Sequence, residues 1–353
     1  MDEDPNFPLG LAIKPSYIAT HAGSTGGEEV ERWDRDTEAD IEQYGIAGRI
    51  WEAVGLLSNY LVPPASALQQ GLEFDPPCGL FDGKSDVNIV ELGSGTGVVG
   101  IKIALHARRL CDGAAHKKTR VFLTDLDNVC PLLDRNARRA GCYAHNDSGD
   151  GDRSKTEVCV QPLPWGSRKH AHQLLCTTVI THVICSDLVY FPHLLAPLLR
   201  SLIDLTGVSD TERGEGGSPK VIIGYRVRSL VKEEAFWRAF AAWFSFEPVL
   251  CRRTMPANAD NEQDWRSFGT RASDRATGAK AASLAKEDEE GEDAPSFVFV
   301  AARKSESLDW QAPSEDALLM GGWMDRKSAD APERKLGQGM DAFELLLFNA
   351  LQG

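Results

Sequence analysis

Near residue 90, an apolar run, a glycine-rich loop and a helix-like segment follow one another without interruption. The run at 88–90 (NIV) leads into 91–97 (ELGSGTG), and residues 98–108 have the character of a helix. Glycine has no Cβ, so the backbone can turn sharply and a ligand can approach the N-terminus of the following helix. This order of elements predicts an α/β fold whose glycine loop holds a nucleotide-like cofactor.

The glycine spacing alone does not identify that cofactor, because residues 95–100 also satisfy the GxGxxG fingerprint of dinucleotide-binding proteins. Two acidic residues favour S-adenosylmethionine over NAD. Glu91, two residues before the first glycine, would repel a pyrophosphate and attract an ammonium group. Asp125 ends the next apolar run and can accept hydrogen bonds from both ribose hydroxyls. S-adenosylmethionine suits both carboxylates, whereas NAD suits only the second.

Charge and hydropathy exclude several classes of protein. The length of 353 residues is enough for one large domain or two small ones. The hydrophobic content of 42% is that of a globular protein. The net charge of -14 argues against a general nucleic-acid or anionic-membrane surface, although an acidic surface can attract a lysine-rich protein. No apolar run reaches the roughly 18 residues that a membrane helix needs. The first residues, MDEDP, are not expected to be a signal peptide.

Eight cysteines are scattered along the chain without a CxxC pair, so we expect no metal site. Most of them lie in apolar stretches and are expected to be buried free thiols. Free thiols are typical of a reducing compartment, so the expected location is the cytoplasm, and also the nucleus.

Apolar runs alternate with helix-like segments through the middle of the chain. Strands are expected at 88–92, 120–124, 157–161, 181–186, 219–225, 246–251 and 296–302, and helices at 96–109, 128–140, 167–175, 191–205 and 230–243. An earlier helix is expected at 46–62, because its periodicity is helical and the two prolines after it stop a helix. The alternation predicts a mainly parallel, doubly wound sheet.

Polar stretches flank and interrupt this core. Residues 1–44 read as a polar N-terminal extension. The stretch 252–295 is rich in Ala, Asp, Glu, Arg and Ser with few apolar residues, so it is predicted to be a disordered insertion. The tail, 304–353, is expected to carry a short helix at 341–348 that docks on the protein's own core. The main domain therefore spans 45–303.

Asp187 and Tyr190 follow the fourth expected strand. Ligands bind outside the carboxyl ends of the strands in open α/β sheets, so both side chains should lie on the same edge as Glu91 and Asp125. From position alone, two roles are open. The pair can face one cleft, or Asp187 can cap the helix after Pro192 while Tyr190 packs.

Together these motifs resemble the DxxY class of seven-β-strand methyltransferases, family 16, many of which are protein-lysine N-methyltransferases. The matching segments are 49–52 (RIWE), 93–97 (GSGTG), 124–125 (TD), Asn136, 163–166 (LPWG), 187–190 (DLVY) and 225–228 (YRVR). The resemblance implies a Rossmann-like, seven-stranded sheet, mostly parallel with an antiparallel last strand. It also implies an enzyme that transfers a methyl group from S-adenosylmethionine to a lysine of a protein substrate. The protein is expected to be a monomer. The polar stretches depart from the family pattern and leave the substrate open.

By the same resemblance, eight residues would bind the cofactor: Trp51, Glu91, Gly93, Ser94, Gly95, Asp125, Trp165 and Ser186. Trp51 would pack beside the cofactor and Trp165 against its adenine. Glu91 would approach the methionine end, Asp125 would hold the ribose, and the loop backbone would shape the site. Ser186 would touch the cofactor near the reaction centre.

Asp187 and Tyr190 would be the catalytic pair that frames the incoming lysine. A lysine has a reference pKa near 10.4, so it must lose a proton before it attacks a methyl group. Asp187 is too weak a base to hold that proton, so it would orient the amine and stabilise charge. The cofactor's sulfonium and desolvation would lower the lysine pKa. Tyr190 would accept a hydrogen bond from the amine and narrow the channel.

Two other functions compete with methyl transfer. A dehydrogenase could use NAD through residues 95–100, but it would need a substrate domain, and too few residues follow 303 to build one. A non-catalytic protein could use the same fold as a binding module. Thermal shift with S-adenosylhomocysteine and with NADH distinguishes these possibilities.

Overall fold

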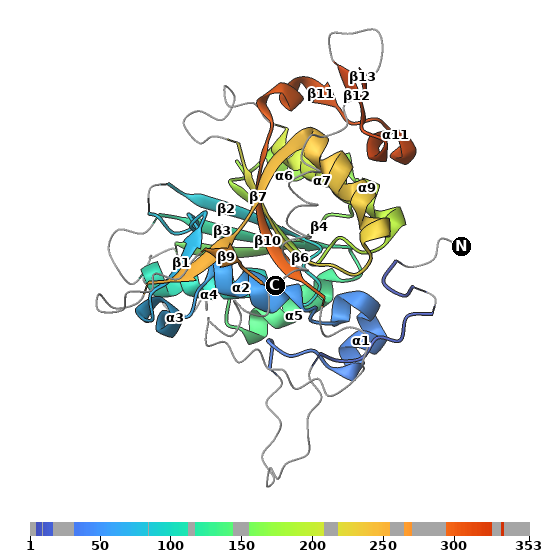
Figure 1. Cartoon of the computed structure of the whole chain (residues 1–353). Helices are drawn as coiled ribbons and strands as arrows, with labels where there is room; N and C mark the ends of the chain where they lie inside the picture. The colour runs from blue at the N-terminus through green and yellow to red at the C-terminus, as the bar shows by residue number, and fades with distance from the viewer. Residues whose placement is uncertain are drawn as a thin grey trace.

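The computed structural model describes residues 5–8, 10–16, 32–83, 85–111, 117–143, 155–207, 218–254, 265–269, 294–326 and 333–334. Across these residues the chain builds a central seven-stranded sheet with helices on both faces (Figure 1). The strand order is β4-β3-β2-β5-β6-β10-β7.

The strands of this sheet are β2 (Val87–Leu92), β3 (Thr119–Asp125), β4 (Thr156–Pro162), β5 (His182–Ser186), β6 (Lys220–Arg226), β7 (Phe244–Pro248) and β10 (Ser296–Arg303). The neighbours from β4 through to β6 pair in parallel, and β10 pairs antiparallel with both β6 and β7. Parallel neighbours need long crossovers, which the intervening helices supply. The predicted α/β class, mostly parallel with an antiparallel last strand, is confirmed.

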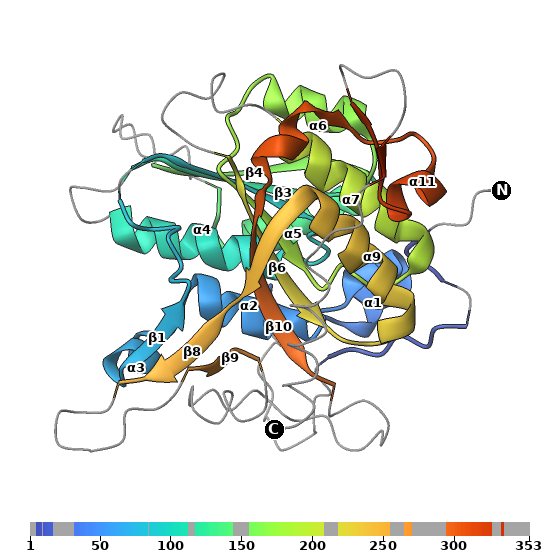
Figure 2. The same ribbon diagram turned by 45° about the horizontal axis from the view of Figure 1, so that its top comes forward.

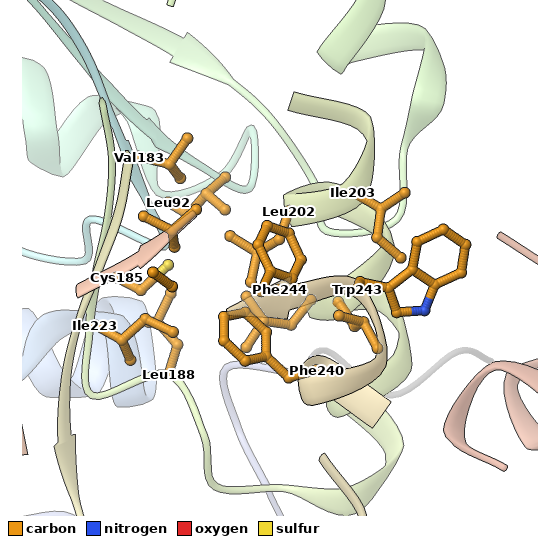
Figure 3. Close-up of a cluster of buried hydrophobic side chains, with 14 of the residues drawn as sticks. Leu92, Val183, Cys185, Leu188, Leu202, Ile203, Ile223, Phe240, Trp243 and Phe244 are labelled. Carbon is orange, nitrogen blue, oxygen red and sulfur yellow. The ribbon is translucent and has the colours of Figure 1, made fainter. Parts of the chain in front are cut away.

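Helices cover both faces of the sheet, and each face has its own apolar core (Figures 1 and 2). One face carries α2 (Ala53–Leu61), α4 (Val98–Cys111) and α5 (Cys130–Arg139), and the other carries α6 (Arg168–Leu175), α7 (Pro192–Thr206) and α9 (Leu230–Trp243). The second core is rich in aromatic rings. Figure 3 shows Phe240 beside Phe244, whose ring centroids lie 4.5 Å apart. The same core includes Leu92, Cys185 and Leu188, so it fixes the carboxyl ends of β2 and β5.

The expected helix at 46–62 is broken into two pieces. A 3-10 helix, η1 (Gly45–Gly48), is followed by an extended stretch and then by α2. The backbone N–H of Ile50 donates to the Asp36 carboxylate at 2.9 Å rather than to a helical carbonyl, and the indole of Trp51 donates to the Ile46 carbonyl at 2.9 Å. These two bonds hold residues 49–52 out of the helix.

The expected strand at 246–251 is divided between two sheets. β7 ends at Pro248, and the N–H of Val249 still donates to the carbonyl of Val298 in β10 at 2.8 Å. β8 (Leu250–Arg253) instead pairs with β1 (Leu72–Asp75) and β9 (Arg266–Ser267). The predicted disorder of 252–295 therefore does not hold at 252–253 and 266–267, whereas 255–264 and 270–293 lie outside the described residues.

Smaller elements complete the described chain. They are α1 (Glu38–Tyr44), α3 (Ala65–Gln69), η3 (Ser305–Asp309), β11 (Trp310–Gln311), α11 (Asp316–Met320), β12 (Trp323–Arg326) and β13 (Glu333–Arg334). The helix predicted at 341–348 lies outside the described residues. Among the helices that the structure describes, none combines the length and the apolar character needed to cross a membrane.

Free thiols are only partly buried, in contrast to the prediction. The described free cysteines are Cys78, Cys130, Cys142, Cys159, Cys176, Cys185 and Cys251. Three of these, at 142, 185 and 251, are buried, and the one at 176 is exposed. Apolar sequence context therefore overestimates their burial; Cys159, for example, lies in β4 at the edge of the sheet.

Candidate functional site

A cavity lies where β2, β3 and β5 end, at the carboxyl edge of the sheet. The ten residues predicted for the site all line it: Trp51, Glu91, Gly93, Ser94, Gly95, Asp125, Trp165, Ser186, Asp187 and Tyr190. Residues from distant parts of the sequence meet here because parallel strands end at one edge. The wall also includes Arg228, from the turn after β6, and Asn6 and Leu11, from the N-terminal segment.

The glycine loop fits tightly between its neighbours. Gly93 and Gly95 have φ of 56° and 53°, in the left-handed region that favours glycine. A Cβ on Gly93 would lie 2.7 Å from the ring of Trp165, and a Cβ on Gly95 would lie 3.0 Å from the carbonyl oxygen of Ala47. The loop can therefore follow this path only without side chains at these two positions.

Ser94 ties the loop to the end of β3. Its hydroxyl donates to the carbonyl of Glu91 at 3.0 Å and accepts from the backbone N–H of Thr124 at 2.9 Å. Its own N–H donates to the carbonyl of Thr124 at 2.9 Å. These bonds join the first two strands of the site and place Asp125 beside the loop.

Two buried carboxylates, Glu91 and Asp125, accept hydrogen bonds from the backbone in and next to the glycine loop. Glu91 is 2% exposed and accepts from the N–H of Gly100 at 3.1 Å, and burial raises its pKa to about 8. Asp125 accepts from the N–H groups of Gly95 and Leu126, each at 2.8 Å. Burial raises the pKa of Asp125 to about 6, although both backbone bonds act to lower it. Carboxylates in this setting are matched to a ligand that supplies positive charge and hydrogen-bond donors.

The stability of the ligand-free protein should fall as pH rises from 6.5 to 8. Burial raises the pKa of Glu91 to about 8 in the folded protein, whereas the ordinary pKa of this carboxyl is 4.5. The folded state thus binds more protons in this window, and the free energy of unfolding should drop by roughly 1–2 kcal/mol. Urea titrations at both pH values measure this. Glu91→Gln, which mimics the protonated side chain, should show a flatter dependence; identical slopes would contradict the assignment.

Aromatic rings form the sides of the cavity. The guanidinium of Arg49 lies 4.5 Å from the ring centroid of Trp51, and that of Arg228 lies 5.5 Å from it. The rings of Trp165 and Tyr190 meet edge to face at 6.2 Å. Burial raises the pKa of Tyr190 above its usual range, so its phenol keeps its proton near neutral pH.

Asp187 is paired through both of its oxygens. Its side chain is completely buried, and the two terminal nitrogens of Arg228 donate to it at 2.7 and 2.6 Å. Its φ of 63° is the only positive value for a non-glycine residue in the described chain. The capping alternative is wrong, because α7 is preceded by Phe191 at the N-cap position and no side chain caps it. A strained, buried carboxylate on a cavity is typical of a functional position.

The importance of Arg228 was not predicted, because the sequence showed its segment only as part of a family resemblance. Glu233, which is buried, accepts from the backbone N–H of Arg228 at 3.3 Å, from the N–H of Ser229 at 3.0 Å and from the hydroxyl of Tyr225 at 2.6 Å. Glu52 lies 3.5 Å from the same guanidinium. The sequence does contain a signal for this pair. Asp187 and Arg228 follow neighbouring strands, and a buried aspartate is stable only with a cation beside it.

The residues of the cavity fit S-adenosylmethionine. The hydroxyl of Ser186 is buried without a hydrogen-bond partner, so a polar ligand atom can satisfy it. Asp125 and Glu91 offer acceptors for ribose hydroxyls and for an ammonium group. The backbone of the glycine loop lines the cavity directly, and the two tryptophans offer flat apolar surfaces for a base.

Comparison with known proteins relates the chain to a family, a curated relative and a solved structure. The sequence profile of a family described as lysine methyltransferase matches residues 34–241. Over 202 residues the chain is 26% identical to the protein-lysine N-methyltransferase EFM6 of Saccharomyces cerevisiae, an alignment that covers 56% of this chain and 70% of the relative. A solved structure of a SAM-dependent O-methyltransferase from Thermotoga maritima aligns over 72% of each chain, at 10% identity and a TM-score of 0.28.

Proposed function

The chain belongs to the lysine methyltransferase family, and on this basis we propose that it transfers a methyl group from S-adenosylmethionine to a lysine of a protein substrate. The observation that carries the proposal is one cavity in which the glycine loop, Glu91 and Asp125 adjoin Asp187 and Tyr190. The yeast relative is a protein-lysine N-methyltransferase, which supports the same substrate class. The expected working form is a monomer in the cytoplasm or nucleus.

In one half of the cavity, five side chains and the backbone of the glycine loop would bind S-adenosylmethionine. Asp125 would accept from the ribose hydroxyls, and Glu91 would face the ammonium of the methionine moiety. Trp51 and Trp165 would supply apolar surface, and Ser186 would satisfy its buried hydroxyl. When bound, S-adenosylmethionine supplies the electrophilic methyl group, and the protein supplies orientation and charge.

The acceptor half of the cavity would orient a neutral amine. Each carboxylate oxygen of Asp187 accepts one hydrogen bond from Arg228. Each oxygen has a further lone pair, so the carboxylate can also accept a hydrogen bond from an amine. Tyr190 would accept a second hydrogen bond through its phenol oxygen. Since Asp187 is already paired with a guanidinium, it does not serve as the base. The lysine proton would leave to water, helped by desolvation and by the positive charge of the cofactor.

Binding and transfer assays test the proposal directly. S-adenosylhomocysteine should raise the melting temperature of the protein, and NADH should not. The protein and tritiated S-adenosylmethionine should label proteins in a lysate from methylation-deficient cells, and acid hydrolysis should release the label as methyl-lysine. Stabilisation by NADH alone would favour the oxidoreductase alternative. Binding of S-adenosylhomocysteine without any transfer to lysine would favour a non-catalytic binding protein.

Asp125→Asn should weaken S-adenosylhomocysteine binding by about 10- to 100-fold, because charge-assisted hydrogen bonds to the ribose are worth roughly 1.5–3 kcal/mol. The amide keeps the size of the side chain and one acceptor oxygen, so the fold should persist. Isothermal calorimetry measures the dissociation constant. Asp127→Asn is the matched control, because that residue is two positions along the chain and exposed. If both variants bind like the wild type, the ribose acid lies elsewhere.

A further inference from the structure

An N-terminal segment outside the family match contributes to the cofactor cavity. The match covers residues 34–241, yet Asn6 and Leu11 line the cavity. In Figures 1 and 2 this dark blue segment runs beside α1. Sequence composition does not predict this placement: residues 1–44 are polar and acidic, and the apolar residues 11–13 are the one part of the extension expected to be ordered.

The first attachment of the segment is at Asn6. Its side chain and backbone are buried, with 5% of the residue exposed, and its carbonyl oxygen accepts from the N–H of Ile46 at 2.9 Å. Gly45 makes this contact possible. A Cβ at that position would lie 1.8 Å from the carbonyl oxygen of Asn6, and the φ of Gly45 is 57°. The end of α1 is therefore shaped to receive the segment.

The second attachment is at Ser16. The buried carboxylate of Asp36 accepts from the hydroxyl of Ser16 at 2.7 Å and from its N–H at 2.9 Å. The same carboxylate accepts from the N–H of Ile50 at 2.9 Å. Asp36 thus joins the end of the segment to the backbone beside Trp51, which is another wall of the cavity.

Leu11 lies between the two attachments. It lines the cavity, but 45% of it is exposed, which is high for a leucine. A turn places it there: its N–H donates to the carbonyl of Pro8 at 3.4 Å, and Gly10 before it has a φ of 81°. A ligand that fills the cavity would remove apolar surface of Leu11 from water, and this burial favours the bound state.

We propose that Asn6 and Leu11 form a wall of the cofactor site, and that Leu11 packs on the bound cofactor and slows its release. The inference rests on the proposed function, because it assigns the cavity to S-adenosylmethionine. It adds binding residues that lie outside the part of the chain matched by the family.

The test measures S-adenosylhomocysteine dissociation from the full-length protein by stopped-flow tryptophan fluorescence. Leu11→Ser should increase the dissociation rate by about five- to tenfold with an almost unchanged association rate. Leu11→Met, which keeps the apolar volume, should stay within twofold of the wild type. The matched control is Phe7→Ser, because Phe7 is also 45% exposed on the same segment but does not line the cavity.

The outcomes separate this inference from the proposed function. If only Leu11→Ser releases S-adenosylhomocysteine faster, and the melting temperature of the ligand-free protein is unchanged, the result supports a contact between Leu11 and the cofactor. Equal rates for Leu11→Ser, Phe7→Ser and the wild type overturn it and leave the proposed function intact. A wild-type protein that does not bind S-adenosylhomocysteine overturns the proposed function, and this inference with it.

Discussion

Asp187→Ala is expected to reduce the rate of methyl transfer by about a hundredfold or more, with cofactor affinity within a few-fold of the wild type. The side chain lines the cavity on the side proposed for the acceptor, where a misplaced amine would lose its line of approach to the methyl group. The contacts proposed for the cofactor, at Glu91, the loop and Asp125, remain in place. Tritium transfer to a lysine-containing substrate measures the first quantity, and calorimetry with S-adenosylhomocysteine measures the second.

The melting temperature of the same variant completes the test of Asp187. Alanine removes a buried charge but leaves Arg228, which is 28% exposed and also contacts Glu52, so the loss of stability should be moderate. A folded variant that binds the cofactor and transfers no methyl group supports the catalytic role. A variant with lower stability and near-normal transfer would show that Asp187 acts on structure alone.

Arg228→Met is expected to destabilise the protein by about 3–5 kcal/mol, because it leaves the fully buried Asp187 carboxylate without a cation. Urea denaturation measures the free energy of unfolding. Arg49→Met is the matched control: Arg49 also lies over Trp51, but it pairs with Glu52, whose side chain is 34% exposed. Loss of such a surface pair should cost less than about 1 kcal/mol.

A double variant checks the cause of this instability. Asp187→Asn together with Arg228→Met removes both charges, so it should regain most of the stability that Arg228→Met loses, without regaining activity. If the double variant is as unstable as Arg228→Met alone, the buried charge is not the cause. If Arg49→Met lowers the free energy of unfolding as much as Arg228→Met does, the bidentate pair does not account for the instability.

The sheet and part of the cavity could be predicted from local patterns, whereas Trp51, Trp165 and Ser186 were predicted only through the family resemblance. Apolar runs, glycine turns and helical periodicity repeat in order, and the parallel topology then carries each strand end to the same edge. The ten predicted residues meet around one cavity, although they come from five separate segments of the sequence. Their roles toward a cofactor and a lysine stay predictions.

The errors came from contacts between residues far apart in sequence. Residues 49–52 are not helical, because the N–H of Ile50 donates to Asp36. The apolar periodicity of residues 46–62 cannot predict that hydrogen bond. β8 separates from β7 because β1, far earlier in the chain, pairs with it. Arg228 gains its importance from Asp187 in another strand end. Each of these features needs a partner that a local pattern does not contain.

The bidentate pair between Asp187 and Arg228 also has a consequence for inhibitor chemistry. Because the guanidinium already neutralises the carboxylate, a fixed positive charge in place of the lysine amine finds no unbalanced anion at Asp187. Such a cation would depend on the faces of Tyr190 and Trp165 for attraction. A bisubstrate compound that links an adenosine unit to an uncharged hydrogen-bond donor would match this cavity better than one that carries a quaternary ammonium.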